Sequence, residues 1–564
     1  MGLDANKNIW EDFFSLLRSY RKEIIQVYVL GLVLSLLSLM FPIGIQLLIN
    51  FIQGANYSVS LFVIIFLMGA SIILAAIFQI YQIRIIEYIE QKLFADYSFK
   101  FVEKFPSLNY LELIYQNARD VANRFFDVVT LQKMVQKILI DFSYSSIIIV
   151  LSLILLCFYH PIFIVMVLIL FVILYFGIKF TFRKGLESGI SYSKYKYDTA
   201  YWIEETGNAS VTLKLAGETD IHFQKLQNTL KNYFLERNNH YYVLEKQFIL
   251  LHTIKFVTII FFVIVGGILV IEQQMNIGEF VASEIVISIL VNSFDKMVFL
   301  IRTIYDLIIS LAKIKEVLDL KEETFKSKTN NENHLDYIKI DLKDVTYEYE
   351  YPKRIVLENI NLQILPQESV LLIGESHSGK TTLLKLLATL ITPTKGHFLI
   401  NDRDLNTYDI SKLRYQIGTY LSNDVIFKGT ILENIHLGRE YDMNFLMEMS
   451  QKIGIDKMIY DLPDKYETEM FTYGFNYSTS FITKLLFLRA IVTQPKLLIL
   501  ENMFNTIYEK DVPILLDIAC NTKEYGWTTI ISSSDAKYKN YFTKILQIKD
   551  GKLLMYDDVG NYPY

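Results

Sequence analysis

The chain is 564 residues long, and 52% of its residues are hydrophobic. A mean hydropathy of +0.29 is too high for a soluble enzyme of this size, so we expect the first half to lie in a membrane. The formal net charge of −5 carries no information about nucleic acid, but the sequence has no basic stripe interleaved with aromatic residues, so we expect no nucleic-acid partner.

Six long apolar stretches in the first half predict six membrane-spanning helices. Each is about long enough to cross a hydrocarbon core of ~30 Å. Between the third and fourth stretches, Tyr159, His160 and Pro161 leave room only for a hairpin turn. The stretches are residues 25–48, 61–80, 138–158, 162–178, 248–271 and 277–301.

The distribution of Lys and Arg predicts the orientation in the membrane. Basic residues such as Arg18 and Lys22 precede the first span, and many more occur in residues 84–137 and 179–246. The loops after the first, third and fifth spans carry none. By the positive-inside rule, the N-terminus, both long loops and the C-terminal half are cytoplasmic.

The two long loops are expected to extend the membrane helices into the cytoplasm, because apolar residues keep a helical spacing, as at Ile86 and Leu93. Each loop is interrupted near its tip, at residues 117–127 and 204–217. Short helices there are predicted to contact a cytoplasmic domain, and ordinary loop turns are the alternative.

Charged residues occur within the last two spans. A charge at the bilayer centre costs ~2.5 to 3.5 kcal/mol by insertion scales, so these side chains should face the bundle interior or a wet cavity. Lys255 with Glu284 is the predicted pair. A structural ion pair or a charge that extends toward a helix end is the alternative to a substrate contact.

The C-terminal part is predicted to be a separate α/β domain. Residues 321–335 are polar and poor in aromatic residues, so they indicate a linker. The predicted organisation is a membrane domain at 1–320, this linker, and a domain at 336–564 in which strand and helix patterns alternate. Cys157 and Cys520 fall in different domains, which excludes a disulfide framework and a cysteine metal cluster.

A phosphate-binding loop stands at residues 371–385, LLIGESHSGKTTLLK. An aliphatic strand pattern precedes GxxxxGKT and an aliphatic helix pattern follows it. Gly374 and Gly379 permit a tight turn, so that successive backbone amides can point at phosphates, and Lys380 adds a positive charge. The Thr381 hydroxyl is the predicted Mg²⁺ ligand. A Gly-rich turn with a chance GKT is the alternative.

With six spans, two long inward loops and this phosphate loop, the chain resembles an ABC exporter half-transporter over almost its whole length. FPIGIQLLINFI at 41–52 and NIGEFVAS at 276–283 are similar to the type I secretion and bacteriocin-exporter branch. That branch often carries an N-terminal cysteine peptidase domain. Since only about two dozen residues precede the first span, leader-peptide cleavage by this chain is not expected.

The resemblance implies a six-helix membrane domain of the type I exporter joined to an α/β P-loop nucleotide-binding domain. It implies an integral protein of a bacterial inner or plasma membrane that uses ATP and Mg²⁺. Tyr349 stands where the family stacks an aromatic residue on adenine, and His377 stands where a glycine is usual. The residues that the resemblance assigns to nucleotide binding are Tyr349, Gly374, Ser376, His377, Ser378, Gly379, Lys380, Thr381 and Thr382.

Other family positions are replaced. The glutamine that reaches Mg²⁺ aligns with Ser422, the catalytic glutamate with Asn502, and the switch histidine with Ser534. Glu501 replaces the aspartate that holds Mg²⁺ and can still serve this role. Losing a general base costs ~10²- to 10⁴-fold in rate, so we expect ATP binding with very slow hydrolysis.

The LSGGQ signature, which in this family caps the γ-phosphate bound by the opposite subunit, aligns with Tyr477 to Phe481. Ser478 is retained, while Thr479 and Ser480 add side chains that hinder close approach. One chain therefore carries lesions that touch both composite sites of a dimer. A heterodimer with an intact partner is the favoured assembly, and a homodimer is the alternative.

Two functions follow from these predictions. The first is an ATP-driven exporter subunit that moves a peptide or other amphiphile outward. The second is a non-hydrolysing, nucleotide-gated membrane protein with a regulatory or scaffolding role. Steady-state ATP turnover distinguishes them.

Overall fold

The computed structural model describes residues 11, 13–54, 59–115, 118–323, 335–534 and 536–556. The chain divides into two compact units. The first contains Met1–Leu108 and Glu112–Lys321, and the second contains Asn109–Leu111 and Glu322–Tyr564. Of the predicted linker 321–335, residues 324–334 lie outside the described residues.

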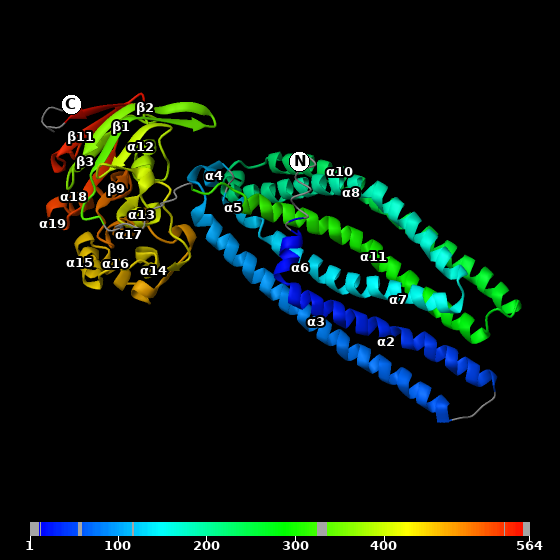
Figure 1. Cartoon of the computed structure of the whole chain (residues 1–564). Helices are drawn as coiled ribbons and strands as arrows, with labels where there is room; N and C mark the ends of the chain where they lie inside the picture. Colours follow the sequence, from blue (N-terminus) through cyan, green and yellow to red (C-terminus); the bar gives the residue numbers. More distant parts are fainter. Residues whose placement is uncertain are drawn as a thin grey trace. The chain divides into compact units, whose positions relative to one another are not determined.

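The first unit is a bundle of long helices that run side by side (Figure 1). His160 caps the end of α7 and Pro161 caps the start of α8, as the hairpin prediction requires. The six longest helices are α2 (Arg21–Gln53), α3 (Val59–Ser107), α7 (Ser143–Tyr159), α8 (Ile162–Asn208), α10 (Ile221–Ile271) and α11 (Ile277–Leu318). The shorter ones are α4 (Tyr110–Tyr115), α5 (Ala118–Asn123), α6 (Phe126–Lys137), the π-helix η1 (Ile138–Phe142) and α9 (Ser210–Leu215).

Both long loops continue as helices beyond the apolar stretches, and short helices interrupt them as predicted. Helix α5 stands within the predicted first interruption and α9 within the second, whereas the first break begins earlier than predicted, because α3 ends at Ser107 and α4 precedes residue 117. Residues 116 and 117 lie outside the described residues. Helix α9 exposes apolar side chains, with Leu215 84% exposed. The tips therefore carry surfaces that a partner element can cover.

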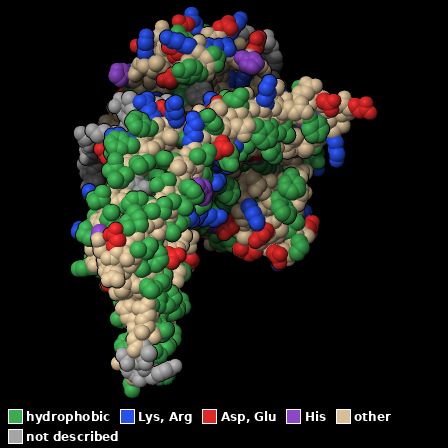
Figure 2. All heavy atoms as spheres, turned by 90° about the vertical axis from the view of Figure 1, so that its right-hand side faces the viewer, with side chains coloured by type: hydrophobic (Ala, Val, Ile, Leu, Met, Phe, Trp, Pro, Cys, Tyr) green, Lys and Arg blue, Asp and Glu red, His purple; other side chains and the backbone are tan. Residues whose placement is uncertain are grey.

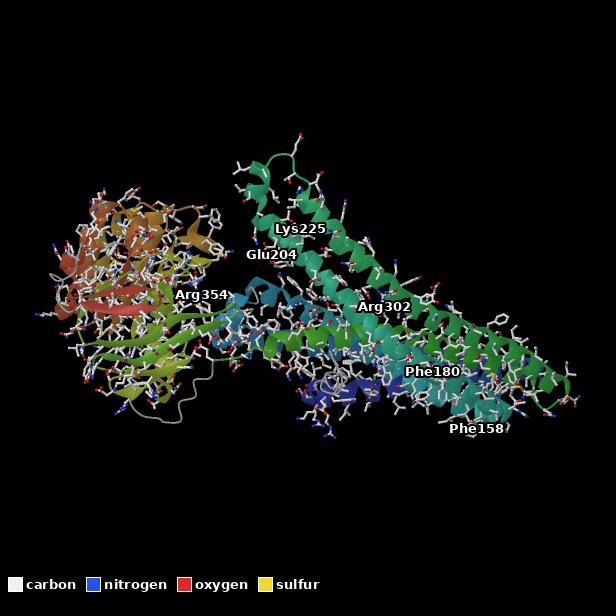
Figure 3. The ribbon with its side chains drawn as sticks, turned by 90° about the horizontal axis from the view of Figure 1, so that it is seen from above. Phe158, Phe180, Glu204, Lys225, Arg302 and Arg354 are labelled. Carbon is white, nitrogen blue, oxygen red and sulfur yellow. The ribbon has the colours of Figure 1, made fainter. Side chains whose placement is uncertain are left out.

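Four described segments are long and apolar enough to cross a membrane, and the other two predicted spans lie in α8 and α11. Large apolar side chains such as Phe62 and Phe158 are mostly exposed on these helices, as lipid contact requires. Figure 2 shows hydrophobic side chains gathered over the long helices. In Figure 3, Phe158 and Phe180 lie toward one end of the bundle and Glu204 and Lys225 toward the other. The four segments are Arg21–Gln53, Val59–Ser107, Val121–Tyr159 and Ile221–Ile271.

The predicted pairing of Lys255 with Glu284 is wrong. Lys255 Nζ donates instead to Asp295 Oδ2 at 2.9 Å. Helices α10 and α11 form an antiparallel hairpin, and Lys255 lies more than four turns before its tip. Asp295 lies about five turns beyond the tip, at the same level, whereas Glu284 lies only about two turns beyond it.

The second unit contains a six-stranded sheet of order β12-β11-β3-β10-β9-β6, a four-stranded antiparallel sheet of order β2-β1-β4-β5, and the pair β7-β8. From β11 to β6 the larger sheet is parallel. Its strands are β3 (Ser369–Ile373), β6 (Ile417–Tyr420), β9 (Leu497–Glu501), β10 (Thr528–Ser533), β11 (Lys544–Lys549) and β12 (Lys552–Tyr556). The others are β1 (Ile340–Glu350), β2 (Lys353–Ile364), β4 (Lys395–Ile400), β5 (Arg403–Asp404), β7 (Gly429–Thr430) and β8 (Glu469–Met470).

The central strands β3, β9 and β10 are buried along their whole length, because helices cover a parallel sheet on both faces. Their carboxyl ends meet at one edge, the usual place for a ligand site in such a sheet. The helices of this unit are α12 (Lys380–Leu387), α13 (Ile410–Tyr415), α14 (Ile431–His436), α15 (Met443–Ile453), α16 (Asp456–Tyr460), α17 (Thr479–Ile491), α18 (Val512–Cys520) and α19 (Thr522–Tyr525).

The buried ion pair between Lys484 on α17 and Asp511 gives a stability prediction. Their side chains are 7% and 16% exposed and lie 2.7 Å apart. Lys484→Met leaves the Asp511 carboxylate buried without its cation, which costs ~3 to 5 kcal/mol, so the apparent melting temperature of the purified chain should fall by several degrees. Replacing Asp511 by Leu as well should recover most of the loss.

Lys452→Met is the control, because Lys452 and Glu448 form an exposed pair that is worth at most ~1 kcal/mol. Equal melting temperatures of the Lys484 and Lys452 variants would contradict the prediction.

Candidate functional site

The phosphate loop joins the end of β3 to the start of α12. A Cβ at Gly374 would lie 2.5 Å from the Ile548 carbonyl oxygen, so only glycine fits there. Gly379 has φ +112°, which favours glycine, and it begins α12. His377 has φ +65°, so the side chain at this usual glycine position does coincide with a left-handed turn.

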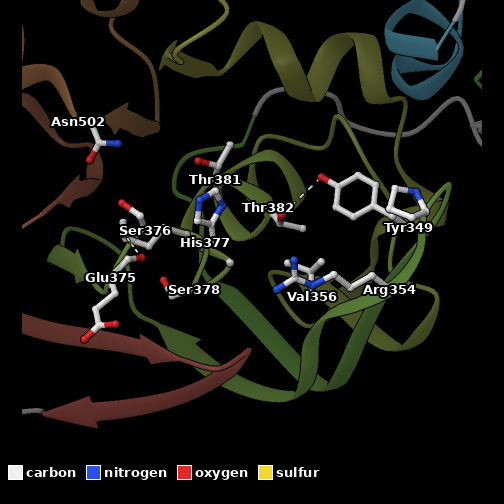
Figure 4. Close-up of a pocket in the computed structure, with 13 residues that line it drawn as sticks. Tyr349, Arg354, Val356, Glu375, Ser376, His377, Ser378, Thr381, Thr382 and Asn502 are labelled. Carbon is white, nitrogen blue, oxygen red and sulfur yellow. Dashed lines mark hydrogen bonds between the residues drawn. The ribbon is translucent and has the colours of Figure 1, made fainter.

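A cavity of about 460 Å³ opens beside this loop, within the size range of small-molecule sites. The hydroxyl groups of Tyr349 on β1 and Thr382 on α12 lie 3.4 Å apart, which ties the aromatic ring to the loop (Figure 4). All of the residues predicted from the loop, except Gly374, line this cavity together with Tyr349. The lining residues are Tyr349, Pro352, Arg354, Val356, Glu375, Ser376, His377, Ser378, Gly379, Lys380, Thr381, Thr382 and Asn502.

Lys380 folds back on the loop. Its Nζ donates to the carbonyl oxygens of Gly374 and Glu375, the second at 2.8 Å. Burial lowers the pKa of this ammonium, and the nearby Glu501 carboxylate acts in the opposite direction. A bound anion would offer stronger acceptors than the two carbonyls and would favour the charged amine.

The buried carboxylate of Glu501 is held from two sides. Thr381 Oγ1 donates to Glu501 Oε1. On the other side, the Ser422 amide and hydroxyl donate to Glu501 Oε2 at 2.8 and 2.7 Å. A hydroxyl and a carboxylate are hard oxygen ligands that fit Mg²⁺, so Thr381 and Glu501 form a suitable pair for this ion. Ser422, however, points its hydroxyl at the carboxylate.

Asn502 follows β9 and also lines the cavity. Its backbone N–H donates to the Ser532 carbonyl and hydroxyl oxygens at 3.2 and 3.1 Å. A carboxamide does not accept a proton near neutral pH, so Asn502 cannot act as a general base. Ser534 stands directly after β10, is exposed, and does not line the cavity.

The signature segment stands at the start of α17, apart from the residues that line this cavity. Ser478 caps the helix, because its hydroxyl accepts from the Phe481 amide at 3.2 Å. Thr479 is exposed and Ser480 is buried. Stacking of the Tyr477 and Phe481 rings, with centroids 4.9 Å apart, fixes the entry into the helix.

Four lining residues were not singled out from the sequence: Pro352, Arg354, Val356 and Glu375. Glu375 lies inside the phosphate-loop motif and could have been included. The other three become neighbours of Tyr349 only through the β1–β2 hairpin, whose turn lies at 351–352. The signal for them was the Pro352 that follows Tyr349 and marks this turn.

Residues 357–505 match the sequence model of the ABC transporter family. The alpha-hemolysin translocation ATP-binding protein HlyB of Escherichia coli O157:H7 is 28% identical over 258 residues, 45% of this chain and 36% of that protein. The uncharacterized ABC transporter ATP-binding protein YfiB of Bacillus subtilis (strain 168) is 28% identical over 217 residues, 38% of this chain and 37% of that protein. The aligned part of the chain thus spans well under half the length of these relatives.

The structure of a bacterial Atm1-family ABC exporter with ATP bound superimposes with a TM-score of 0.83. The match covers 96% of this chain and 95% of the other, at 15% sequence identity. At this identity the match shows the fold alone. The chain therefore has the fold of an ABC exporter, with a helical membrane domain and a nucleotide-binding domain, and residues 357–505 match the ABC transporter family in sequence.

The lowered pKa of Lys380 gives a prediction for binding at alkaline pH. A phosphate beside the ammonium should raise this pKa again, so ATP binding at alkaline pH should take up protons. Calorimetry in two buffers of different ionisation enthalpy measures this uptake. Lys380→Arg should bind ATP without it, because a guanidinium stays protonated at this pH.

Lys380→Ala should weaken ATP binding itself, since the variant loses the cation. The same proton uptake in wild type and Lys380→Arg would show that another group titrates.

Proposed function

We propose that this chain, whose residues 357–505 match the ABC transporter family in sequence, is one half of an ATP-dependent membrane exporter. The observation that carries the proposal is the cavity in which Tyr349, the phosphate loop and Thr381 come together beside Glu501. The membrane domain at 1–320 has six spans, and the linker at 321–335 leads to a cytoplasmic domain at 336–564. A bacterial inner or plasma membrane is the proposed location.

In this proposal ATP lies with its base on the Tyr349 ring and its phosphates against the loop amides of 376–382. Lys380 leaves its two carbonyl partners for the phosphates. Thr381 and Glu501 hold Mg²⁺, which when bound neutralises phosphate charge. The side chain of Ser378 supports this arrangement, because within the described residues its buried hydroxyl oxygen has no hydrogen-bond partner.

We infer that hydrolysis at this site is slow. Asn502 has a carboxamide at the position where a general base is needed, and the Ser422 hydroxyl donates its hydrogen bond to Glu501. Ser534 cannot replace a histidine as a proton carrier at neutral pH. ATP occupancy is then the main signal that this chain supplies, and closure around ATP is transmitted to the membrane helices through the short helices at the loop tips.

We propose a heterodimer with a half-transporter of intact motifs. The signature residues Ser478, Thr479 and Ser480 would face the phosphate loop of that partner. The leukotoxin translocation ATP-binding protein LktB of Mannheimia haemolytica is 28% identical over 248 residues, 44% of this chain and 35% of that protein. The toxins in the names of HlyB and LktB support a polypeptide among the possible amphiphilic substrates. Asn502 also favours the second candidate, a nucleotide-gated regulatory protein without turnover.

The proposal of a slow site predicts the effect of restoring the base. Asn502→Glu alone should raise the ATP turnover of the purified chain only slightly, because Ser422, Ser534 and the altered signature remain. Asn502→Gln has the same length without a carboxylate and should leave turnover unchanged. High wild-type turnover that disappears in Lys380→Ala would show that the site is not impaired.

The heterodimer is tested by cross-linking. Cysteines are placed at Ser478 and Ser376 of a chain without Cys157 and Cys520, and in the phosphate loop of the co-purified half-transporter. We expect Ser478→Cys to link to the partner's loop in the presence of ATP and few links between two copies of this chain. Self-linked dimers alone, with transport intact, would reject the heterodimer and favour the nucleotide-gated alternative.

A further inference from the structure

Arg354 shares a face of the β1–β2 hairpin with the aromatic ring of the site. In the antiparallel register, Tyr349 stands directly opposite Arg354, and Glu350 stands opposite Lys353. Side chains of directly opposed residues lie on the same face of a sheet, and neighbours along a strand lie on opposite faces. Tyr349 and Arg354 both line the cavity, whereas Lys353 does not.

The two neighbouring cations have different surroundings. Lys353 Nζ lies 3.8 Å from Glu348 Oε1 on the other face of the hairpin. Within the described part of the chain, no hydrogen bond or ion pair holds the Arg354 guanidinium. Figure 4 shows this side chain reaching from β2 beside Val356 into the cavity, below the Tyr349 ring. The guanidinium therefore offers its donors to whatever occupies the cavity.

The charged side chains that line the cavity leave room for a second cation beside an anionic ligand. Glu375 contributes a carboxylate to the lining, and Lys380 opposes it with one ammonium. Without Arg354, these two charges cancel, and a nucleotide brings several further negative charges. A guanidinium can donate two parallel hydrogen bonds to one phosphate, which an ammonium cannot.

We propose that Arg354 is a further nucleotide-binding residue, which binds the α-phosphate of the nucleotide whose base lies on Tyr349. This inference rests on the proposed function of the cavity. Tyr349 marks the base end of the site and the loop amides mark the β- and γ-phosphate end. Arg354 stands on the strand opposite Tyr349, at the base end, where the ribose and the first phosphate lie.

The test compares nucleotides that differ in their number of phosphates. Affinities of the full purified chain for ATP, ADP, AMP and 2′-deoxy-ATP are measured by calorimetry. Arg354→Ala should lower the affinities for ATP, ADP and AMP by a similar factor, about tenfold or more, because all three nucleotides carry the α-phosphate. Arg354→Lys should recover part of the loss. Lys353→Ala, the matched control on the other face, should bind like wild type.

Several results would overturn the inference. If Arg354→Ala bound AMP as tightly as wild type does, with an unchanged melting temperature, Arg354 would not contact the α-phosphate. A preference of wild type for ATP over 2′-deoxy-ATP that disappears in Arg354→Ala would place the guanidinium on the ribose instead. Failure of the proposed function has a different signature, because wild type and Lys380→Ala would then both bind no ATP, whatever stands at 354.

Discussion

The buried carboxylate of Glu501 is the constraint on which the site depends. It stands at the carboxyl end of β9, and a charge at this depth must be hydrogen-bonded. Thr381 at the start of α12 and Ser422 after β6 supply the donors. The carboxylate thus joins three segments that are far apart in the sequence, and it fixes the phosphate loop against the sheet edge before any nucleotide binds.

Two residues that we predicted to depart from the family pattern, Glu501 and Ser422, contact each other here. Glu501 is one methylene longer than the aspartate expected there, and Ser422 is shorter than the expected glutamine. The Ser422 hydroxyl donates to the Glu501 carboxylate at 2.7 Å, so these two side chains are hydrogen-bonded to each other. The hydrogen bond engages the Ser422 hydroxyl, so in this structure it is not a free ligand.

The membrane unit obeys a similar rule for buried polar groups. Lys255 and Asp295 neutralise each other between α10 and α11. Gln247 on α10 donates to the hydroxyl groups of Thr181 and Tyr305 at 2.7 and 3.2 Å. These two groups find partners on neighbouring helices, which lowers the high cost of placing a polar group away from water.

The sequence by itself determined the elements and the loop chemistry. Apolar length and helical spacing predicted the long helices and their extensions, and Gly374, Gly379 and Lys380 marked the phosphate loop, because these signals are local. It did not determine which residues face each other. The Lys255 partner depended on the level of two antiparallel helices, and the role of Ser422 depended on the exact reach of Glu501. Arg354 joined the cavity only through the register of the β1–β2 hairpin. Such pairings are fixed by tertiary packing, since residues distant in the chain meet only after the helices and strands have assembled.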